Sequence, residues 1–273
     1  MAAHEFHSGE IGVQTRVGVA GVGARVARGI SYELSERALG LLTRQRLAVV
    51  AGTDARGAVW ASPLRGAPGF LRGHGGGALE IATGFPPGDP LEQVFALSAP
   101  IGVLGIDLAE RRRVRVNGSA RLEAGGGLRV APAEVFVNCP KYITPRELPT
   151  RAPAGSSRTG SALDPAQRAF IARADTFFIA TVHAERGPDA SHRGGPPGFV
   201  RVLDQHRLVW PDYEGNAMFQ TLGNLSVDPR AGLLFVDFQS GATLQLSGRA
   251  RIVWEPERAV GFQVERWVSR PAA

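Results

Sequence analysis

Apolar runs broken by Gly- and Pro-rich turns give this chain its main pattern. Leu47–Ala51 and Thr176–Val182 are rich in β-branched or aromatic residues, which favour a pleated, half-buried strand. Similar runs predict further strands at Ala58–Leu64, Leu79–Thr83, Ile101–Asp107, Arg113–Leu122, Leu128–Val137, Asp189–His192, Phe199–Leu203, Arg207–Trp210, Gly232–Phe238 and Thr243–Trp254. Many short strands with few helices predict a mainly β (α+β) fold of small barrels with peripheral helices.

A helical period appears before each of the first two runs. Leu34–Gln45 has apolar residues at helical spacing, with Ser31 or Ser35 available as the N-cap. Asp164-Pro165 supplies a cap and a first-turn proline for a second helix. Shorter helices are expected at Pro90–Leu97 and Asn216–Leu225, and no regular element is predicted for residues 1–30.

The pattern also occurs twice. Arg44–Phe70 aligns without a gap to Arg173–Phe199, at a separation of 129 residues. The match resumes at a separation of 130 residues, where Gly102–Leu108 aligns with Gly232–Phe238 and Val114–Leu122 with Leu244–Ile252. This period is too long for a solenoid and indicates two tandem domains. We expect a first copy at 1–150, a linker at 151–161 and a second copy at 162–273, packed as a dimer-like pair within one chain.

Composition narrows the class of protein. The chain has 273 residues, 44% of them hydrophobic and 21% charged, as expected for a soluble globular protein. No apolar run approaches the roughly 20 residues of a membrane span, and the first residues lack the apolar centre of a secretion signal. A single cysteine favours the reducing cytoplasm. The net charge of +6 is scattered arginine without interleaved aromatic residues, which argues against nucleic-acid binding, and Arg111–Arg113 with Arg115 is interpreted as a solvated strand end.

The two copies differ most at turns. Ser62-Pro63-Leu64-Arg65-Gly66 in the first copy corresponds to Ser191-His192-Arg193-Gly194-Gly195 in the second. Arginine forks and backbone amides exposed by glycine are suited to bind a phosphate or an electron-rich carbonyl. A polar loop with a solvated arginine explains the same residues equally well.

A second difference lies in the segment Pro211–Leu225, which gathers polar residues around Met218-Phe219. Amide edges beside apolar side chains suit a flat heteroaromatic ligand. Helix core explains the Met-Phe pair as well, and Asn216 and Asn224 also fit as helix caps.

The third feature is Asn138–Ile143, which holds the chain's only cysteine and only lysine. A lone Cys139 is typical of a small buried hydrophobic residue, and the sequence offers no metal site. Among so many arginines, Lys141 is expected to have a specific role as a compact charge near a bound anion or the negative edge of a reduced flavin.

Taken together, these segments resemble the pyridoxamine 5′-phosphate oxidase-like proteins of the FMN-binding split-barrel superfamily, and most of all their tandem-barrel group. The resemblance is carried by FHSGE, NCPKYI, ADTFFIAT, SHRGGPPGFVRV, DYEGNAMFQTLGNL and DPRAGLLFVDF, and it covers nearly the whole chain. It implies a six-stranded split barrel in each copy, with FMN bound where the two barrels meet.

The resemblance also assigns residues to the cofactor. Arg193, with Ser191 and Gly194, corresponds to the strand end that holds the flavin and its phosphate. Tyr213 and Asn216 correspond to further phosphate and ribityl contacts, and Gln245 to a residue that reaches the flavin edge from the partner barrel. Lys141 and Asn224 complete the expected cofactor-binding set, and His192 is the candidate for proton transfer.

The expected function is that of an FMN-dependent oxidoreductase acting on a small molecule. Gly215-Asn216-Ala217 stands where the oxidase itself has a Ser-Arg-Lys turn, which argues against pyridoxamine phosphate oxidation. The electrons would come from a separate reductase or from reduced nicotinamide, and further homodimerisation remains open. The alternatives are a non-catalytic flavin or haem carrier, with His183 or His192 on the iron, and a deazaflavin-dependent reductase.

Overall fold

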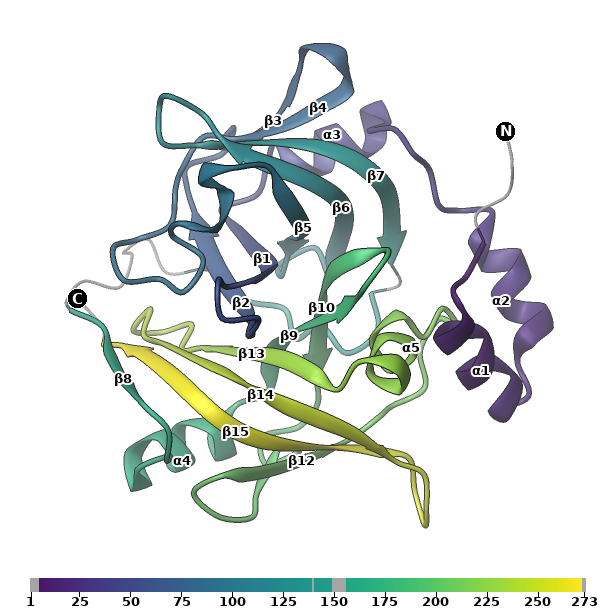
Figure 1. Ribbon diagram of the computed structural model, residues 1–273, viewed down its shortest axis with the longest axis vertical. Coiled ribbons are helices and arrows are strands. Elements are labelled where there is room, and N and C mark those ends of the chain that lie inside the picture. Colours follow the sequence, from purple (N-terminus) through teal and green to yellow (C-terminus); the bar gives the residue numbers. More distant parts are fainter. Residues whose placement is uncertain (1–4, 139, 149–155, 272–273) are drawn as a thin grey trace.

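Two antiparallel sheets make up most of the molecule, which confirms the mainly β prediction (Figure 1). The computed structural model describes residues 5–138, 140–148 and 156–271. The sheet of the first copy occupies the upper part of Figure 1 and that of the second copy the lower part, with helices at the periphery. Within those described ranges, no helix has the length and apolar character needed to cross a membrane.

The first barrel begins with three helices and continues with seven strands. Its elements are α1 (Ser8–Arg16), α2 (Ala20–Ala27), α3 (Glu36–Leu42), β1 (Leu47–Thr53), β2 (Val59–Arg65), β3 (Leu71–His74), η1 (Gly75–Gly77), β4 (Ala78–Ile81), η2 (Val94–Ala96), β5 (Ala99–Asp107), β6 (Arg112–Leu122) and β7 (Leu128–Asn138).

The elements of the second barrel are β8 (Arg158–Gly160), α4 (Pro165–Arg173), β9 (Thr176–His183), β10 (Gly187–Gly194), β11 (Arg201–Val202), β12 (Arg207–Pro211), α5 (Gln220–Val227), β13 (Arg230–Val236), β14 (Thr243–Val253) and β15 (Ala259–Arg270). From α4 onward, the second barrel repeats the strand order that follows α3 in the first, and β8 is an additional strand.

The two sheets have the same topology. The strand orders are β2-β1-β5-β6-β7-β4-β3 and β10-β9-β13-β14-β15-β12-β11, which are equivalent strand for strand. Each also has a bulge at the same place, between Asn117 and Gly118 in one sheet and between Ser247 and Gly248 in the other. An added Cβ would lie 2.0 Å from the Ala131 carbonyl oxygen at Gly118, and equally close to a facing carbonyl at Gly248. The two copies therefore share both the strand order and the position of the bulge, as expected for a tandem duplication.

The predicted helix starts are confirmed in both copies. The Ser35 side chain accepts a hydrogen bond from Ala38 N at the start of α3. Asp164 and Gln167 form a reciprocal capping box at the start of α4, with Pro165 in the first turn.

Several elements differ from the prediction. Residues 1–30 contain α1 and α2, and the long strand β15 and the short strand β3 were not predicted. The helix expected at Pro90–Leu97 is only the single turn η2, and α5 begins at Gln220, after Phe219, so that Asn216 precedes the helix instead of capping it. Part of the expected linker, residues 151–155, lies outside the described residues, while β8 within it pairs with β15.

Each barrel has its own apolar core, and a further buried cluster lies between the barrels. In β1, Ala48 and Val50 face the first barrel's interior, while Val49 and Ala51 face the second barrel. On the other side, Phe178 of β9 and Leu234 of β13 complete the shared cluster. The central strands are thus buried on both faces, which explains why they are near-continuous apolar runs and do not alternate.

Two equivalent glycines set the distance between the barrels. A Cβ on Gly102 of β5 would lie 2.5 Å from the Pro188 carbonyl oxygen of β10. A Cβ on Gly232 of β13 would lie 2.6 Å from Trp60 Cα of β2. Each barrel therefore places its second strand against the fifth strand of the other, as in the isologous interface of a two-fold dimer.

Gly232→Ala is expected to lower the free energy of unfolding by about 1–3 kcal/mol, because the new methyl group meets backbone atoms that cannot move independently. Urea denaturation followed by circular dichroism measures the change. Gly125→Ala is the control, since an added Cβ there meets nothing within 4 Å. Equal stability of the two variants would contradict this account of the interface.

Candidate functional site

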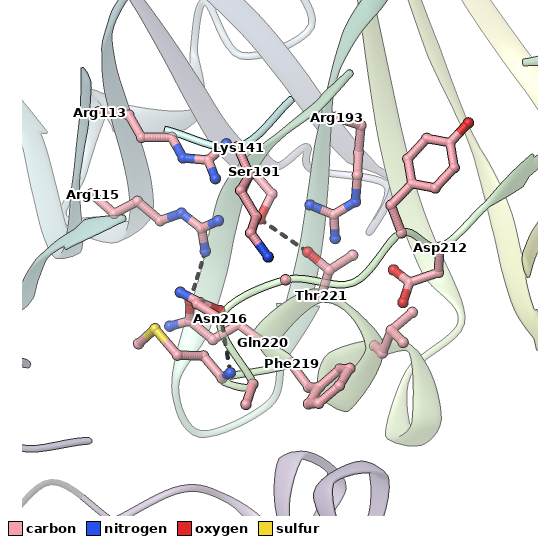
Figure 2. Close-up of a pocket in the computed structure, with 15 residues that line it drawn as sticks. Arg113, Arg115, Lys141, Ser191, Arg193, Asp212, Asn216, Phe219, Gln220 and Thr221 are labelled. Atoms are coloured by element: carbon pink, nitrogen blue, oxygen red, sulfur yellow. Dashed lines mark hydrogen bonds between the residues drawn. The ribbon is translucent and has the colours of Figure 1, made fainter. Parts of the chain in front are cut away.

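A pocket with a volume of about 100 Å³ lies where β10 of the second barrel meets β6 of the first. We call this contact the open junction. Its lining comes from both barrels and consists of Arg113, Arg115, Lys141, Ser191, Arg193, Asp212, Tyr213, Gly215, Asn216, Ala217, Met218, Phe219, Gln220, Thr221 and Leu222. Figure 2 shows Arg113 and Arg115 on one side, Arg193 on the other, and the segment that leads into α5 below them.

Strand alternation decides which side chains of β10 reach the pocket. Ser191 and Arg193 lie on one face of β10 and line the pocket. His192 lies between them on the opposite face, where it is 3% exposed and packs edge-on against Phe178. The Ser-His-Arg turn predicted from the sequence is thus the end of a strand, and it presents only its hydroxyl and guanidinium groups to the pocket.

Positive charge dominates this pocket. It is lined by Arg113, Arg115, Arg193 and Lys141, against the single carboxylate of Asp212. Burial lowers the pKa of Arg193, and the charge of Asp212 opposes that shift. Because cations withdrawn from water require an opposite charge, the site favours an anionic ligand.

A buried hydrogen-bond network forms the wall behind the pocket. Arg115 Nη1 donates to Asp189 Oδ2 at 3.1 Å and to Gln220 Oε1 at 2.6 Å, which joins both barrels to α5. Ser191 Oγ donates to Asp189 Oδ2 at 3.1 Å and accepts from Thr221 Oγ1 at 3.0 Å. Breaking a buried pair such as Arg115–Asp189 costs about 3–5 kcal/mol, so this wall is rigid.

The start of α5 faces the same pocket. Gln220, Thr221 and Leu222 are its first three residues, and no side chain caps this helix. The N–H groups of a first helical turn lack partners within the helix and attract anions. Ala217 and Phe219 reach this turn with φ angles of 61° and 58°, a left-handed conformation that non-glycine residues adopt at a cost.

Lys141 and Tyr142 approach the pocket from the side of the first barrel. The Tyr142 ring stacks on Tyr213 at 5.2 Å, its hydroxyl donates to the Glu214 carbonyl oxygen at 3.0 Å, and its backbone has a φ of 65°. An added Cβ on Gly194 would lie 1.9 Å from the Tyr142 carbonyl oxygen. Gly194 is therefore required for this close approach, whether or not it contacts a ligand. Cys139 lies outside the described residues.

Two predicted cofactor residues do not line the pocket. Gln245 lies at the contact of β14 with β2, where its Nε2 donates to Ser62 Oγ at 2.8 Å and to the Ala61 carbonyl oxygen at 3.1 Å. Asn224 is inside α5, not a cap, and its amide donates to Thr181 Oγ1 at 2.9 Å. Both amide nitrogens are bonded within the protein, and the structure does not bring either residue to this pocket.

Neither candidate histidine lines the pocket. His192 Nδ1 is 3.1 Å from Arg113 Nη1, and burial together with the nearby arginines lowers the pKa of His192 well below its usual range. A neutral ring accepts a hydrogen bond from Arg113 and holds that arginine at the pocket wall. His183 stacks on His7 with ring centroids 4.1 Å apart.

The contact of β2 with β14 is the counterpart of the open junction, and we call it the closed junction. Leu64 stands there in place of Arg193, and Gln245 in place of Arg115. Asp89 Oδ1 accepts from Ser62 Oγ at 2.7 Å, and burial raises the pKa of Asp89. The polar side chains at this junction bond to one another, and the Leu64 side chain is buried in the core of the first barrel.

Arg113 and Arg115 are site residues that the sequence analysis missed. The sequence shows them as a basic strand end, and only the contact of β6 with β10 across the interface places them at the pocket. The usable signal was the repeat itself, because Arg115 aligns with Gln245. Each junction combines strands of both copies, so the residue that faces β10 of the second copy lies on β6 of the first copy.

The fold and site define a class: a tandem split barrel with one cationic pocket at the contact between its barrels. Residues 163–272 match the family model described as pyridoxamine 5′-phosphate oxidase. The match shows that the second barrel is similar to the pyridoxamine 5′-phosphate oxidase family. No curated protein matches the chain.

Solved structures similar to this chain include single barrels of the same kind. HupZ of Group A Streptococcus is 18% identical with a TM-score of 0.33, and the match covers 41% of this chain and 98% of HupZ. A putative pyridoxamine 5′-phosphate oxidase from Lactobacillus delbrueckii is 17% identical with a TM-score of 0.32, covering 39% of this chain and 93% of that one. An FMN-binding protein from Syntrophomonas wolfei is 9% identical with a TM-score of 0.30, covering 37% of this chain and 82% of that one.

Behind the pocket, helix α1 adds a buried carboxyl group. Burial raises the pKa of Glu10 to about 8, and the neighbouring Glu134 and Asp189 contribute to the shift. Glu10 Oε2 accepts from His7 N at 3.0 Å, and a Cβ on Gly223 of α5 would lie 2.8 Å from Glu10 Cα. The helix that faces the pocket is thus supported by a group that stays protonated at neutral pH.

Glu10→Gln is expected to remove part of the pH dependence of stability. Between the ordinary pKa of 4.5 and about 8, the unfolded chain releases a proton that the folded protein retains, so rising pH favours unfolding. Relative to the native protein, the variant should gain on the order of 2 kcal/mol or more between pH 5 and pH 8. Urea denaturation at both pH values measures this difference. The exposed Glu33→Gln is the control, and parallel pH profiles for Glu10→Gln and the native protein would contradict the prediction.

Proposed function

We propose that this protein binds FMN at the open junction and acts as a flavin-dependent oxidoreductase on a small molecule. The observation that carries the proposal is the convergence of three arginines, one lysine and an uncapped helix start on one pocket between two split barrels. The similarity of the second barrel to the pyridoxamine 5′-phosphate oxidase family supports the same ligand class.

The residues at the pocket fit a phosphorylated flavin. Its volume of about 100 Å³ is below the roughly 300 Å³ at which pockets for whole ligands begin, and so suits an anionic group held inside with the ring system toward the open mouth. Arg193 and the first N–H groups of α5 would hold the phosphate. Tyr213 and Phe219 offer apolar surface for the rings, and Asn216 a polar edge.

The bound flavin would supply the two-electron redox chemistry, while the protein supplies binding, orientation and electrostatics. Lys141 would place a compact positive charge near the anionic part of the ligand. His192, held neutral behind the wall, would keep Arg113 in position and would not transfer protons in the pocket. The proposal includes a separate reductase or reduced nicotinamide as the source of electrons and the cytoplasm as the location.

The alternative cofactors make distinct predictions. Haem ligation receives no support from the geometry, because neither His183 nor His192 lines the pocket. A deazaflavin would use the same anion-binding groups and differs in its absorption spectrum. A carrier without turnover would retain a flavin that reduced nicotinamide or a partner reductase does not reduce.

Arg193→Ala is expected to lower the flavin retained through purification by at least about tenfold, because a charge-assisted hydrogen bond to an anion contributes about 1.5–3 kcal/mol. Mass spectrometry of the released ligand and absorbance near the blue measure the loss. Arg193→Lys should retain an intermediate amount, and the exposed Arg44→Ala the full amount. Undiminished flavin in Arg193→Ala would remove this residue from the site and refute the proposed binding mode.

The proposal sets the stoichiometry at one FMN per chain, because the closed junction is filled by Leu64 and by the hydrogen bonds among Gln245, Ser62 and Asp89. Titration of the cofactor-free protein with FMN, followed by flavin fluorescence, gives the number of sites. A value of two would show that the closed junction opens to admit a second flavin.

A further inference from the structure

The outer face of the second barrel carries a groove that the proposed flavin site does not use. It has a volume of about 540 Å³ and runs over β14, β15, β12 and the residues around β11. Its centre is apolar and small, with Val209 and Gly261 on the floor and Val253 and Leu203 beside them. The strands that form it lie at the bottom of Figure 1, on the far side from the first barrel.

Arginines border this groove on both sides. Arg249 and Arg251 project from β14, while Arg201 and Arg207 belong to β11 and β12. All four are exposed. In the described part of the chain, Arg207 pairs with Asp204, and the other three have no ion pair.

The duplicated barrel provides an internal comparison. Strand pairing aligns Arg251, Gly261, Val209 and Arg201 in one row across the second sheet. The equivalent row of the first sheet consists of Arg121, Arg129, Glu80 and Arg72. The outer arginines are the same, while the inner Arg129 and Glu80 are replaced by a glycine and a valine.

The first barrel neutralises its arginines. Glu80 pairs with Arg72, and Glu123 accepts from Arg129 Nε at 2.8 Å. The second barrel has Val209 at the position of Glu80 and Val253 at that of Glu123. The two acids that balance this face in one copy are therefore both valines in the other, so that the face has an apolar floor and an excess of positive charge at its edges.

We propose that this groove binds an acidic, extended segment of a partner protein. Neighbouring strands are about 4.8 Å apart, so the two arginine edges, three strands apart, lie about 14 Å from each other. An extended chain along the groove can direct carboxylates to both edges and an apolar side chain to the floor, whereas a single charged headgroup reaches only one edge. The concave shape disfavours a flat membrane surface, and the floor has no exposed aromatic ring on which a base could stack.

The test uses a fluorescein-labelled octapeptide of alternating glutamate and leucine, with fluorescence anisotropy as the readout. We expect saturable binding to the full chain that weakens with salt, and no binding of the same peptide with glutamine in place of glutamate. Val209→Glu with Val253→Glu restores the acids of the first barrel and should weaken binding about tenfold, as should Arg201→Gln with Arg251→Gln. The matched control is Arg72→Gln with Arg121→Gln on the first barrel, which should leave the affinity unchanged.

Three outcomes would overturn the proposal. The first is equal affinity of the native protein and the Val209→Glu, Val253→Glu variant. The second is an equal loss in the first-barrel control, which would indicate a general charge effect. The third is binding to phosphatidylserine vesicles without binding to the peptide, which would make the ligand a membrane. Flavin content and melting temperature, measured on every variant, separate these outcomes from misfolding and from failure of the proposed cofactor site.

Discussion

The close approach of two backbones at Gly102 and Gly232 is the constraint on which the rest of the structure depends. With no Cβ at either position, the second strand of each barrel lies directly against the fifth strand of the other. This crossed contact buries both faces of the central strands and creates two equivalent junctions at once. The existence of a site between the barrels therefore follows from backbone packing, before any side chain at the site is considered.

Side chains then decide which junction remains open. A single chain, unlike a homodimer, can change one junction without changing the other. Leu64 and the Gln245–Ser62–Asp89 contacts fill one side, while Arg193, Arg115 and the start of α5 leave a charged pocket on the other. Duplication within one chain removes the symmetry that a homodimer imposes on its two junctions. One junction can therefore stabilise the contact between the barrels, while the other keeps an open pocket.

Much of this fold is predictable from the sequence, since each strand of the paired core is an apolar run and each copy supports the interpretation of the other. The parts that were not predictable depend on contacts between distant segments. Helix α1 is defined by its packing on α5, more than 200 residues away, and not by a clear apolar stripe of its own. The family resemblance placed Gln245 at the flavin edge, reached from the partner barrel, but the two barrels cross, so that each junction combines strands of opposite copies. That crossing places Arg115 where Gln245 was expected.

The electrostatics of the open junction also explain why its pocket is small and rigid. Arg115 Nη1 donates to Asp189 and Gln220, so this side chain contributes mainly to the structure of the pocket wall. Arg193, by contrast, has only the His192 carbonyl oxygen at 3.0 Å as a hydrogen-bond partner among the described residues, and Asp212 compensates part of its charge. Withdrawing such a guanidinium from water costs free energy, and a neutral ligand cannot offset this desolvation cost. An anion can offset it, because the low dielectric that penalises the buried cation also strengthens its attraction to an opposite charge. In the proposed binding mode, the only partly compensated charge of Arg193 would select the phosphate end of the flavin, and the contact between the barrels would fix where the rest of it lies.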